Sequence, residues 1–149
     1  MQLLFVGDVM LGRLVNQLLK ARPPAEHPPF ARALLDAGAD IIFGHSGHVW
    51  RGIEWYQCKP ILYCAGDFID DYAMDELERN DQGFVCVVEL EGDRVRRLLL
   101  YPTVIGEFQA RRACPDEAEA IAGKMGGLCA ELHTNASWQE EEQALLIEP

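Results

Sequence analysis

Residues 38–49, GADIIFGHSGHV, carry the strongest indication of fold and function in this chain. The apolar run 41–43 ends at Gly44, and two histidines, His45 and His48, follow directly. Such a run predicts a buried strand, and open α/β sheets place their ligand-binding groups at the carboxyl ends of buried strands. We therefore predict that both histidines belong to a ligand site.

The start of the chain has the same pattern. The apolar run 3–6 ends at Gly7 and places Asp8 at a second strand end. One carboxylate and two imidazoles at parallel strand ends suit zinc, iron or manganese, so we predict a divalent-metal site formed by Asp8, His45 and His48. The alternative is a polar surface pair, because a His-x-x-His motif in a loop commonly occurs without a metal.

An acidic segment follows a third predicted strand and contains Asp67, Asp70, Asp71 and Asp75. Segments of this kind usually form turns, in which the Asp side chains accept hydrogen bonds from nearby N–H groups. The functional alternative is that Asp67 contacts the ion or orients one of the histidines. Both interpretations stay open from the sequence alone.

Three other polar residues have weaker context. Arg13 comes just after the first predicted strand, where it could meet a substrate phosphate, although an arginine on a helix surface is the simpler interpretation. His27 and His133 lie near no strand end, and we predict that both are surface residues.

The composition limits the function classes. The 149 residues carry a formal net charge of −11, which argues against a nucleic-acid partner, because binding to phosphates needs clustered lysine and arginine. No apolar run approaches the ~20 residues of a membrane span, and no signal-peptide pattern occurs, so we expect no membrane association. The five cysteines form no C-x-x-C pair, which favours free thiols in a reducing cytoplasm.

Periodicity predicts a single mixed α/β domain over residues 1–149. A parallel strand pair with a right-handed crossover is expected near the start, and a β-hairpin around residues 91–93. The segment 22–29, with four prolines in eight residues, is the only obvious linker. The predicted helices are residues 11–21, 30–37 and 115–132; the predicted strands are residues 3–8, 40–43, 53–56, 60–65, 84–90, 95–101 and 144–147.

Several of these motifs together resemble the CapA family, bacterial proteins linked to poly-γ-glutamate capsule synthesis. The resemblance covers both ends and most of the chain, and the last motif is similar to one branch of the family. The motifs are FVGDVMLGR at 5–13, LDAGAD at 35–40, GHSGHV at 44–49 with GIE at 52–54, ILYCAGDF at 61–68, and DFIDDY at 67–72 with RND at 79–81.

The resemblance implies a calcineurin-like metallophosphoesterase fold, a four-layer αββα sandwich with a two-metal centre. Asp8 matches the first-strand metal aspartate of that family, and His45 and His48 match its late histidines, one on each metal. Met10 stands where other phosphoesterases carry a further histidine. Many members have Asn in place of Asp67.

The chain departs from the family in its central region. Family members carry an Asn-Glu ligand motif, an Asn-Asn-His motif with the proton-donating histidine, and another metal-binding histidine there, and none of these occurs here. The proline-rich stretch 22–29 marks the junction. The resemblance therefore implies a truncated αββα sandwich that binds one divalent ion weakly, with slow or absent hydrolysis of phosphate esters and no assigned catalytic residue.

Two alternative functions are compatible with the shortened chain, and the shortening also predicts a dimer. The chain could be a non-catalytic scaffold or oligomeric interaction module with relic metal ligands, or a fragment of a longer enzyme. Loss of central strands leaves an unpaired sheet edge, which invites pairing with another chain. We therefore predict a homodimer, two-fold symmetric, formed through an exposed sheet edge.

Overall fold

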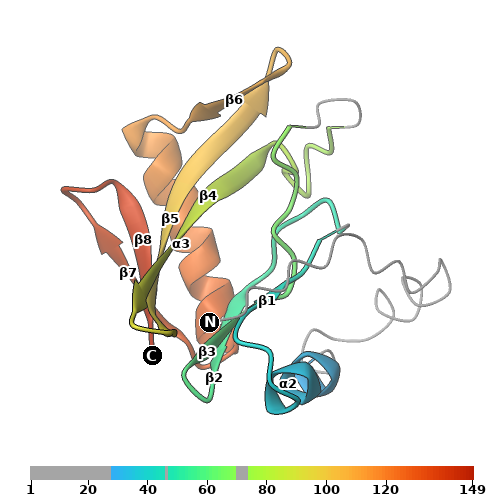
Figure 1. The fold of residues 1–149 in the computed structure, drawn as a ribbon. Coiled ribbons are helices and arrows are strands. Elements are labelled where there is room, and N and C mark those ends of the chain that lie inside the picture. The colour runs from blue at the N-terminus through green and yellow to red at the C-terminus, as the bar shows by residue number, and fades with distance from the viewer. Residues whose placement is uncertain (1–27, 46, 70–73) are drawn as a thin grey trace, which may run out of the picture.

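The structure, a computed structural model, describes residues 28–45, 47–69 and 74–149. The predicted strand at residues 3–8, the predicted helix at residues 11–21, Asp8 and Arg13 lie outside the described residues. The described part contains two sheets and two helices (Figure 1), which confirms the predicted mixed α/β class. Neither of these helices is long and apolar enough to cross a membrane.

The smaller sheet has the strand order β1-β3-β2, formed by β1 (Ile42–Phe43), β2 (Ile53–Tyr56) and β3 (Lys59–Leu62). β1 runs parallel to β3, whereas β2 and β3 form an antiparallel hairpin. Its turn residues, Gln57 and Cys58, both have positive φ, as the tight turns of two-residue hairpins require.

Helix α2 (Pro28–Asp36) covers one face of this sheet through Ala31 and Leu35, which pack against Ile61. The helix begins two residues before the predicted start at residue 30, and Pro28 and Pro29 form its first turn. Proline suits that position, because the first helical N–H groups have no partner within the helix.

The larger sheet is antiparallel, with the order β4-β5-β8-β7 and β6 paired to the far end of β5. The predicted hairpin is confirmed and extends further than predicted, with Gly92 at φ +64 in its turn. The sequence patterns missed β6 and β7 entirely. The strands are β4 (Gln82–Glu91), β5 (Arg94–Gly106), β6 (Gln109–Arg112), β7 (Asn135–Gln139) and β8 (Ala144–Glu148).

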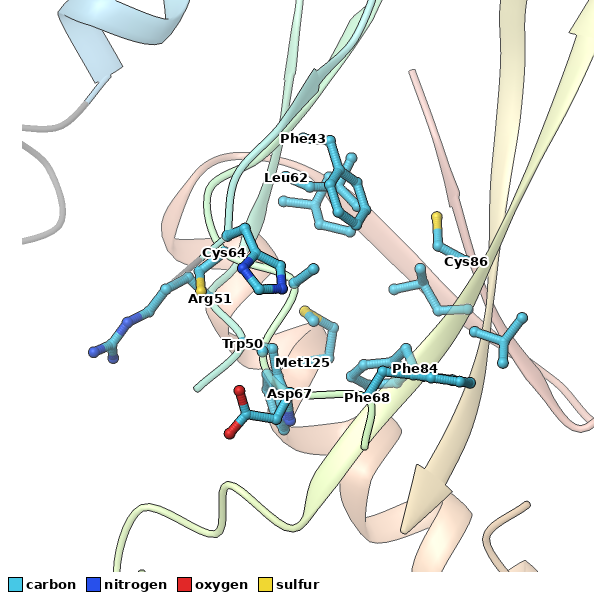
Figure 2. Close-up of a pocket in the computed structure, with 16 residues that line it drawn as sticks. Phe43, Trp50, Arg51, Leu62, Cys64, Asp67, Phe68, Phe84, Cys86 and Met125 are labelled. Atoms are coloured by element: carbon cyan, nitrogen blue, oxygen red, sulfur yellow. The ribbon is translucent and has the colours of Figure 1, made fainter. Parts of the chain in front are cut away.

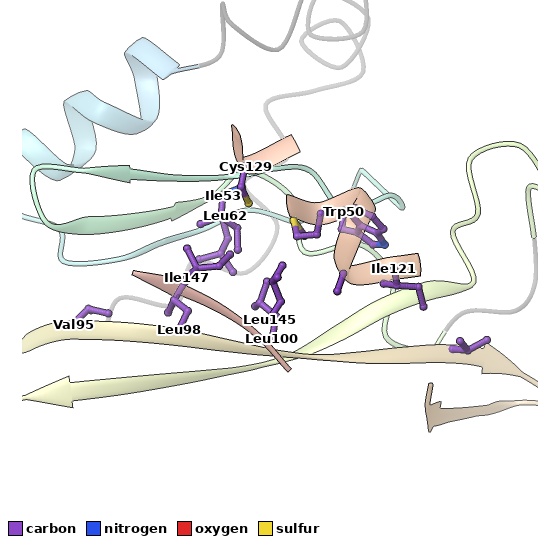
Figure 3. Packing of buried hydrophobic residues seen from close by; sticks show 13 residues of the cluster. Trp50, Ile53, Leu62, Val95, Leu98, Leu100, Ile121, Cys129, Leu145 and Ile147 are labelled. Atoms are coloured by element: carbon purple, nitrogen blue, oxygen red, sulfur yellow. The ribbon is translucent and has the colours of Figure 1, made fainter. Parts of the chain in front are cut away.

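One hydrophobic core joins the two sheets and helix α3 (Pro115–Glu131), as Figure 3 shows. The smaller sheet contributes Ile53 and Leu62, and the larger sheet faces them with alternating residues of β5 and β8. Helix α3 completes the core with its buried face, whose spacing confirms the predicted helix. The core side chains of β5, β8 and α3 include Leu98, Leu100, Leu145, Ile147, Ile121, Met125 and Cys129.

Candidate metal and substrate site

The parallel pairing of β1 with β3 brings two predicted site segments together. Both strands end at the same edge of the smaller sheet, so the loop after β1 and the loop after β3 emerge side by side. Backbone hydrogen bonds join the two loops: the N–H of Gly44 donates to the carbonyl of Leu62 at 2.7 Å, and the N–H of Ala65 to the carbonyl of Gly44 at 3.0 Å. A third bond, from the N–H of Arg51 to the carbonyl of Cys64 at 3.0 Å, continues the contact.

His48 and Asp67 meet across these two loops. The Nδ1 atom of His48 lies 3.1 Å from Oδ1 and 3.3 Å from Oδ2 of Asp67. The Asp67 side chain is buried, with 8% exposed, whereas 67% of the His48 side chain is exposed. A carboxylate can only accept here, so Nδ1 carries the proton and Nε2 keeps its lone pair when the ring is neutral. The pair therefore presents an oriented imidazole at the protein surface.

Two glycines allow this close approach. A Cβ atom on Gly44 would overlap the carbonyl oxygen of Tyr63, and one on Gly66 would lie 2.9 Å from the backbone nitrogen of Trp50. Gly66 also has φ +73, which side chains of L residues rarely adopt. Gly66 directly precedes Asp67 and thus lets the carboxylate reach His48.

The backbone of His48 is itself unusual, with φ +58. A non-glycine residue in the left-handed region costs roughly 1–2 kcal/mol and is uncommon outside turns and functional loops. Here the conformation lies in the same loop that carries the side chain to Asp67. The strained backbone of His48 thus accompanies the orientation in which its ring contacts Asp67.

A cavity of about 420 Å³, lined in part by Asp67, lies between the two sheets (Figure 2). His45 and Asp67 line it, and the remainder of its wall is largely apolar, with Phe43, Trp50 and Phe84 among the lining residues. Trp50 and Phe84 stack edge to face, with ring centroids 5.3 Å apart. An apolar cavity of this size with a few polar groups is typical of small-molecule sites.

A charge network surrounds the buried carboxylate of Glu54 next to the site and was not predicted as a unit. Glu54 on β2 is 4% exposed and accepts hydrogen bonds from Arg32 of α2 at 2.8 Å and from the hydroxyl of Tyr63. Burial, followed by the hydrogen bond to Glu54, raises the pKa of Tyr63 above its ordinary value. Since Tyr63 immediately follows β3, the network fixes α2 and the end of β3 to the same carboxylate.

In the acidic segment, one aspartate caps a turn and another contacts a histidine, so each of the two interpretations applies to a different residue. Asp75 caps a turn, because its Oδ1 accepts from the N–H groups of Leu77 and Glu78 at 2.8 and 3.0 Å, and these bonds lower its pKa. Asp67 instead contacts His48. Asp70 and Asp71 lie outside the described residues.

The predicted three-residue metal site stays a prediction. Asp8 lies outside the described residues, and among those described no group of three or more His, Cys, Asp or Glu side chains could hold an ion. His45 is exposed and lines the cavity, while His48 pairs with Asp67. His133 is exposed, as predicted, and the five cysteines are free thiols.

Comparison with known proteins shows which family the segment around this site resembles. Residues 19–72, which contain both histidines and Asp67, match the family described as bacterial capsule synthesis protein PGA_cap. Over these residues the chain is similar to this CapA family, and its mixed α/β architecture is compatible with the resemblance.

Individual relatives match over short stretches. A probable polyglutamine synthesis accessory protein of Mycobacterium tuberculosis is 58% identical over 43 residues, 29% of this chain and 11% of the relative. The PGA biosynthesis protein CapA of Bacillus subtilis is 54% identical over 41 residues, 28% of this chain and 11% of the relative. The capsule biosynthesis protein CapA of Bacillus anthracis is 40% identical over 50 residues, which are 34% of this chain and 12% of the relative. The matched stretches thus span about a tenth of these relatives.

Proposed function

We propose that this chain is a CapA-family metal-binding protein linked to capsule poly-γ-glutamate synthesis, with weak or no hydrolysis of phosphate esters. The observation that carries the proposal is the His48–Asp67 pair, at 3.1 Å, within the segment matched to the family. The names of the relatives from two Bacillus species, which refer to PGA and capsule biosynthesis, support the link to the capsule polymer.

The donor set fits a divalent ion. A histidine that ligates a metal usually donates its other ring N–H to a carboxylate, which fixes the tautomer and the ring orientation. His48 has such a partner in Asp67, so Nε2 is the nitrogen that would meet an ion. We propose that Asp8 and His45 complete the ligand set. Imidazole and carboxylate ligands together favour zinc, iron or manganese.

The chemistry follows from these groups. A bound ion would supply Lewis-acid polarisation of a phosphoryl oxygen and a water of lowered pKa. Asp67 would hold the His48 ring in place, and Arg13 would meet a phosphate oxygen. The cavity beside His45 would take the organic part of a phosphate ester, since most of its wall is apolar.

Metal content tests the proposal. Protein purified after growth with manganese, zinc and iron should contain close to one ion per chain by elemental mass spectrometry, and the variants Asp8→Ala and His45→Ala/His48→Asn should lose it. Asn is chosen at position 48 because it tolerates the left-handed backbone found there. The matched control His133→Asn replaces an exposed histidine that also has positive φ, and it should keep the ion. An ion content equal in all four proteins would refute the proposed ligand set.

The second candidate is a non-catalytic interaction module. The exposed apolar side chains of β4 favour it, because soluble surfaces rarely gather several such side chains on one strand. Under this alternative, Asp8→Ala changes stability only and no ion is bound by the wild type.

A further inference from the structure

Strand β4 is an open edge of the larger sheet in the part of the chain that the structure describes. It pairs with β5 along one side for all ten of its residues, and no described strand pairs with its other side (Figure 1). The opposite end of the sheet is β7, only five residues long. A long strand edge presents a row of N–H and C=O groups that another strand can pair with.

The exposed edge is also apolar. Val85, Val87, Val88 and Leu90 are 41%, 40%, 37% and 42% exposed. Natural edges are usually protected by lysine, proline or a bulge, and the segment 84–88, FVCVV, contains neither lysine nor proline. The one irregularity, between Glu89 and Leu90, lies after this segment.

The end of β4 near Gly83 is less accessible. A Cβ atom at Gly83 would lie 2.9 Å from the carbonyl oxygen of Asp67, which shows that the loop after β3 packs against β4 at this position. The unprotected edge is therefore residues 84–88, between this loop and the acidic end of the strand.

We infer that β4 pairs antiparallel with β4 of a second copy, about a two-fold axis close to Cys86. The charges of the strand select this orientation. Residues 82–88 carry no charge, Glu89 is paired with Arg97 of β5 at 2.6 Å, and the exposed Glu91 lies at the end of the strand, so antiparallel pairing sets the Glu91 carboxylates of the two copies at opposite ends. Parallel pairing would place like charges side by side, which destabilises a sheet. The pairing is self-complementary and closed, as two-fold interfaces are.

The net charge of the chain predicts how this self-association depends on salt. Each copy carries a formal net charge of −11, so two copies repel each other while a neutral strand segment joins them. Salt screens the repulsion but leaves the backbone hydrogen bonds and apolar contacts in place. The self-association should therefore strengthen as salt is added, whereas binding driven by opposite charges would weaken.

Sedimentation velocity over a concentration series, at low and moderate salt, tests the inference. Wild type should form a dimer whose dissociation constant falls with salt. With the axis at Cys86, Val85 of one copy lies opposite Val87 of the other. Val85→Lys and Val87→Lys therefore each place an ammonium group between the apolar side chains of the two strands, on the exposed face of β4, and both should sediment as monomers. Leu77→Lys, at a loop side chain that is 93% exposed, is the matched control and should dimerise as wild type does.

Two outcomes would overturn the inference. One is a wild type that stays monomeric at both salt concentrations, which would mean that the β4 edge is covered within one chain. The other is Val85→Lys and Val87→Lys proteins that are folded by circular dichroism and still dimerise like wild type. Neither readout depends on metal content, so the dimer and the metal site can fail separately.

Discussion

The most specific chemical feature at the residue scale is the contact between the imidazole of His48 and the carboxylate of Asp67. The sequence predicts each residue as a site candidate, His48 after a strand end and Asp67 in an acidic segment, but it does not predict that the two side chains meet. The parallel pairing of β1 and β3 brings them to 3.1 Å. The supporting glycines, Gly44 and Gly66, leave no space for a side chain.

Asp67→Asn tests what this carboxylate does. The amide keeps the shape of the side chain but removes the charge that orients His48, so we expect metal affinity to fall by about 10–100-fold, the usual effect of removing a partner of a ligating histidine. Competition with a chromophoric zinc chelator measures the change. Asp75→Asn, which alters a turn cap, should leave zinc affinity unchanged. An Asp67→Asn protein that binds zinc as tightly as wild type would argue against the orienting role.

Tyr63→Phe tests the network behind the site. The change removes one of the donors to the buried carboxylate of Glu54, so we expect a loss of about 1–3 kcal/mol in the free energy of unfolding, measured by urea denaturation. Tyr56→Phe removes an exposed hydroxyl 3.4 Å from Asp36 and should change stability by less than about 0.5 kcal/mol. Equal effects of the two substitutions would contradict a special role for Glu54.

The same tyrosine predicts a pH dependence. The pKa of Tyr63 is higher in the folded chain than in the unfolded chain, so the folded state holds this proton more tightly. Its contribution is complete below about pH 10, the unfolded value, and is lost as the pH rises through the folded pKa. Wild type should thus lose stability above about pH 10 more steeply than Tyr63→Phe, and parallel pH profiles would exclude this contribution.

At the element scale, the elements with strong periodicity could be predicted from sequence. The β4–β5 hairpin and α3 follow from alternation and from helical spacing of apolar residues. β6, with the sequence QARR, and β7, with NASWQ, could not be found this way because their side chains are mostly polar. Pairing with β5 and β8 creates these strands, and that information is not local in the sequence.

The loops of the site are more constrained than their composition indicates. Gly66→Ala should destabilise the fold by about 1–3 kcal/mol, because φ is +73 and the new methyl group would meet the backbone of Trp50. Gly123→Ala, in open space on α3, should instead stabilise by about 0.5–1 kcal/mol. Thermal unfolding of the two variants measures both effects. A neutral Gly66→Ala would show that the loop can relax without cost.

At the scale of the whole molecule, the sequence predicted the class of fold and part of the site. The family resemblance predicted the sandwich and the two histidines, whereas the contact between His48 and Asp67 is seen only in the folded structure. The identity of the exposed edge required the sheet order, because the apolar alternation of residues 84–90 is the same for a central and an outer strand. The network of Glu54, Arg32 and Tyr63 likewise required three elements to be in place.

The central claim is that His48, held by Asp67, offers Nε2 to a divalent ion. The most direct measurement is the ring ¹⁵N spectrum of the histidines, recorded with and without zinc. We predict that His48 is the Nδ1–H tautomer without metal, that zinc shifts Nε2 of His48 and a ring nitrogen of His45, and that His133 is unchanged. Zinc that leaves His45 and His48 unshifted, or that shifts His133 equally, would contradict the account.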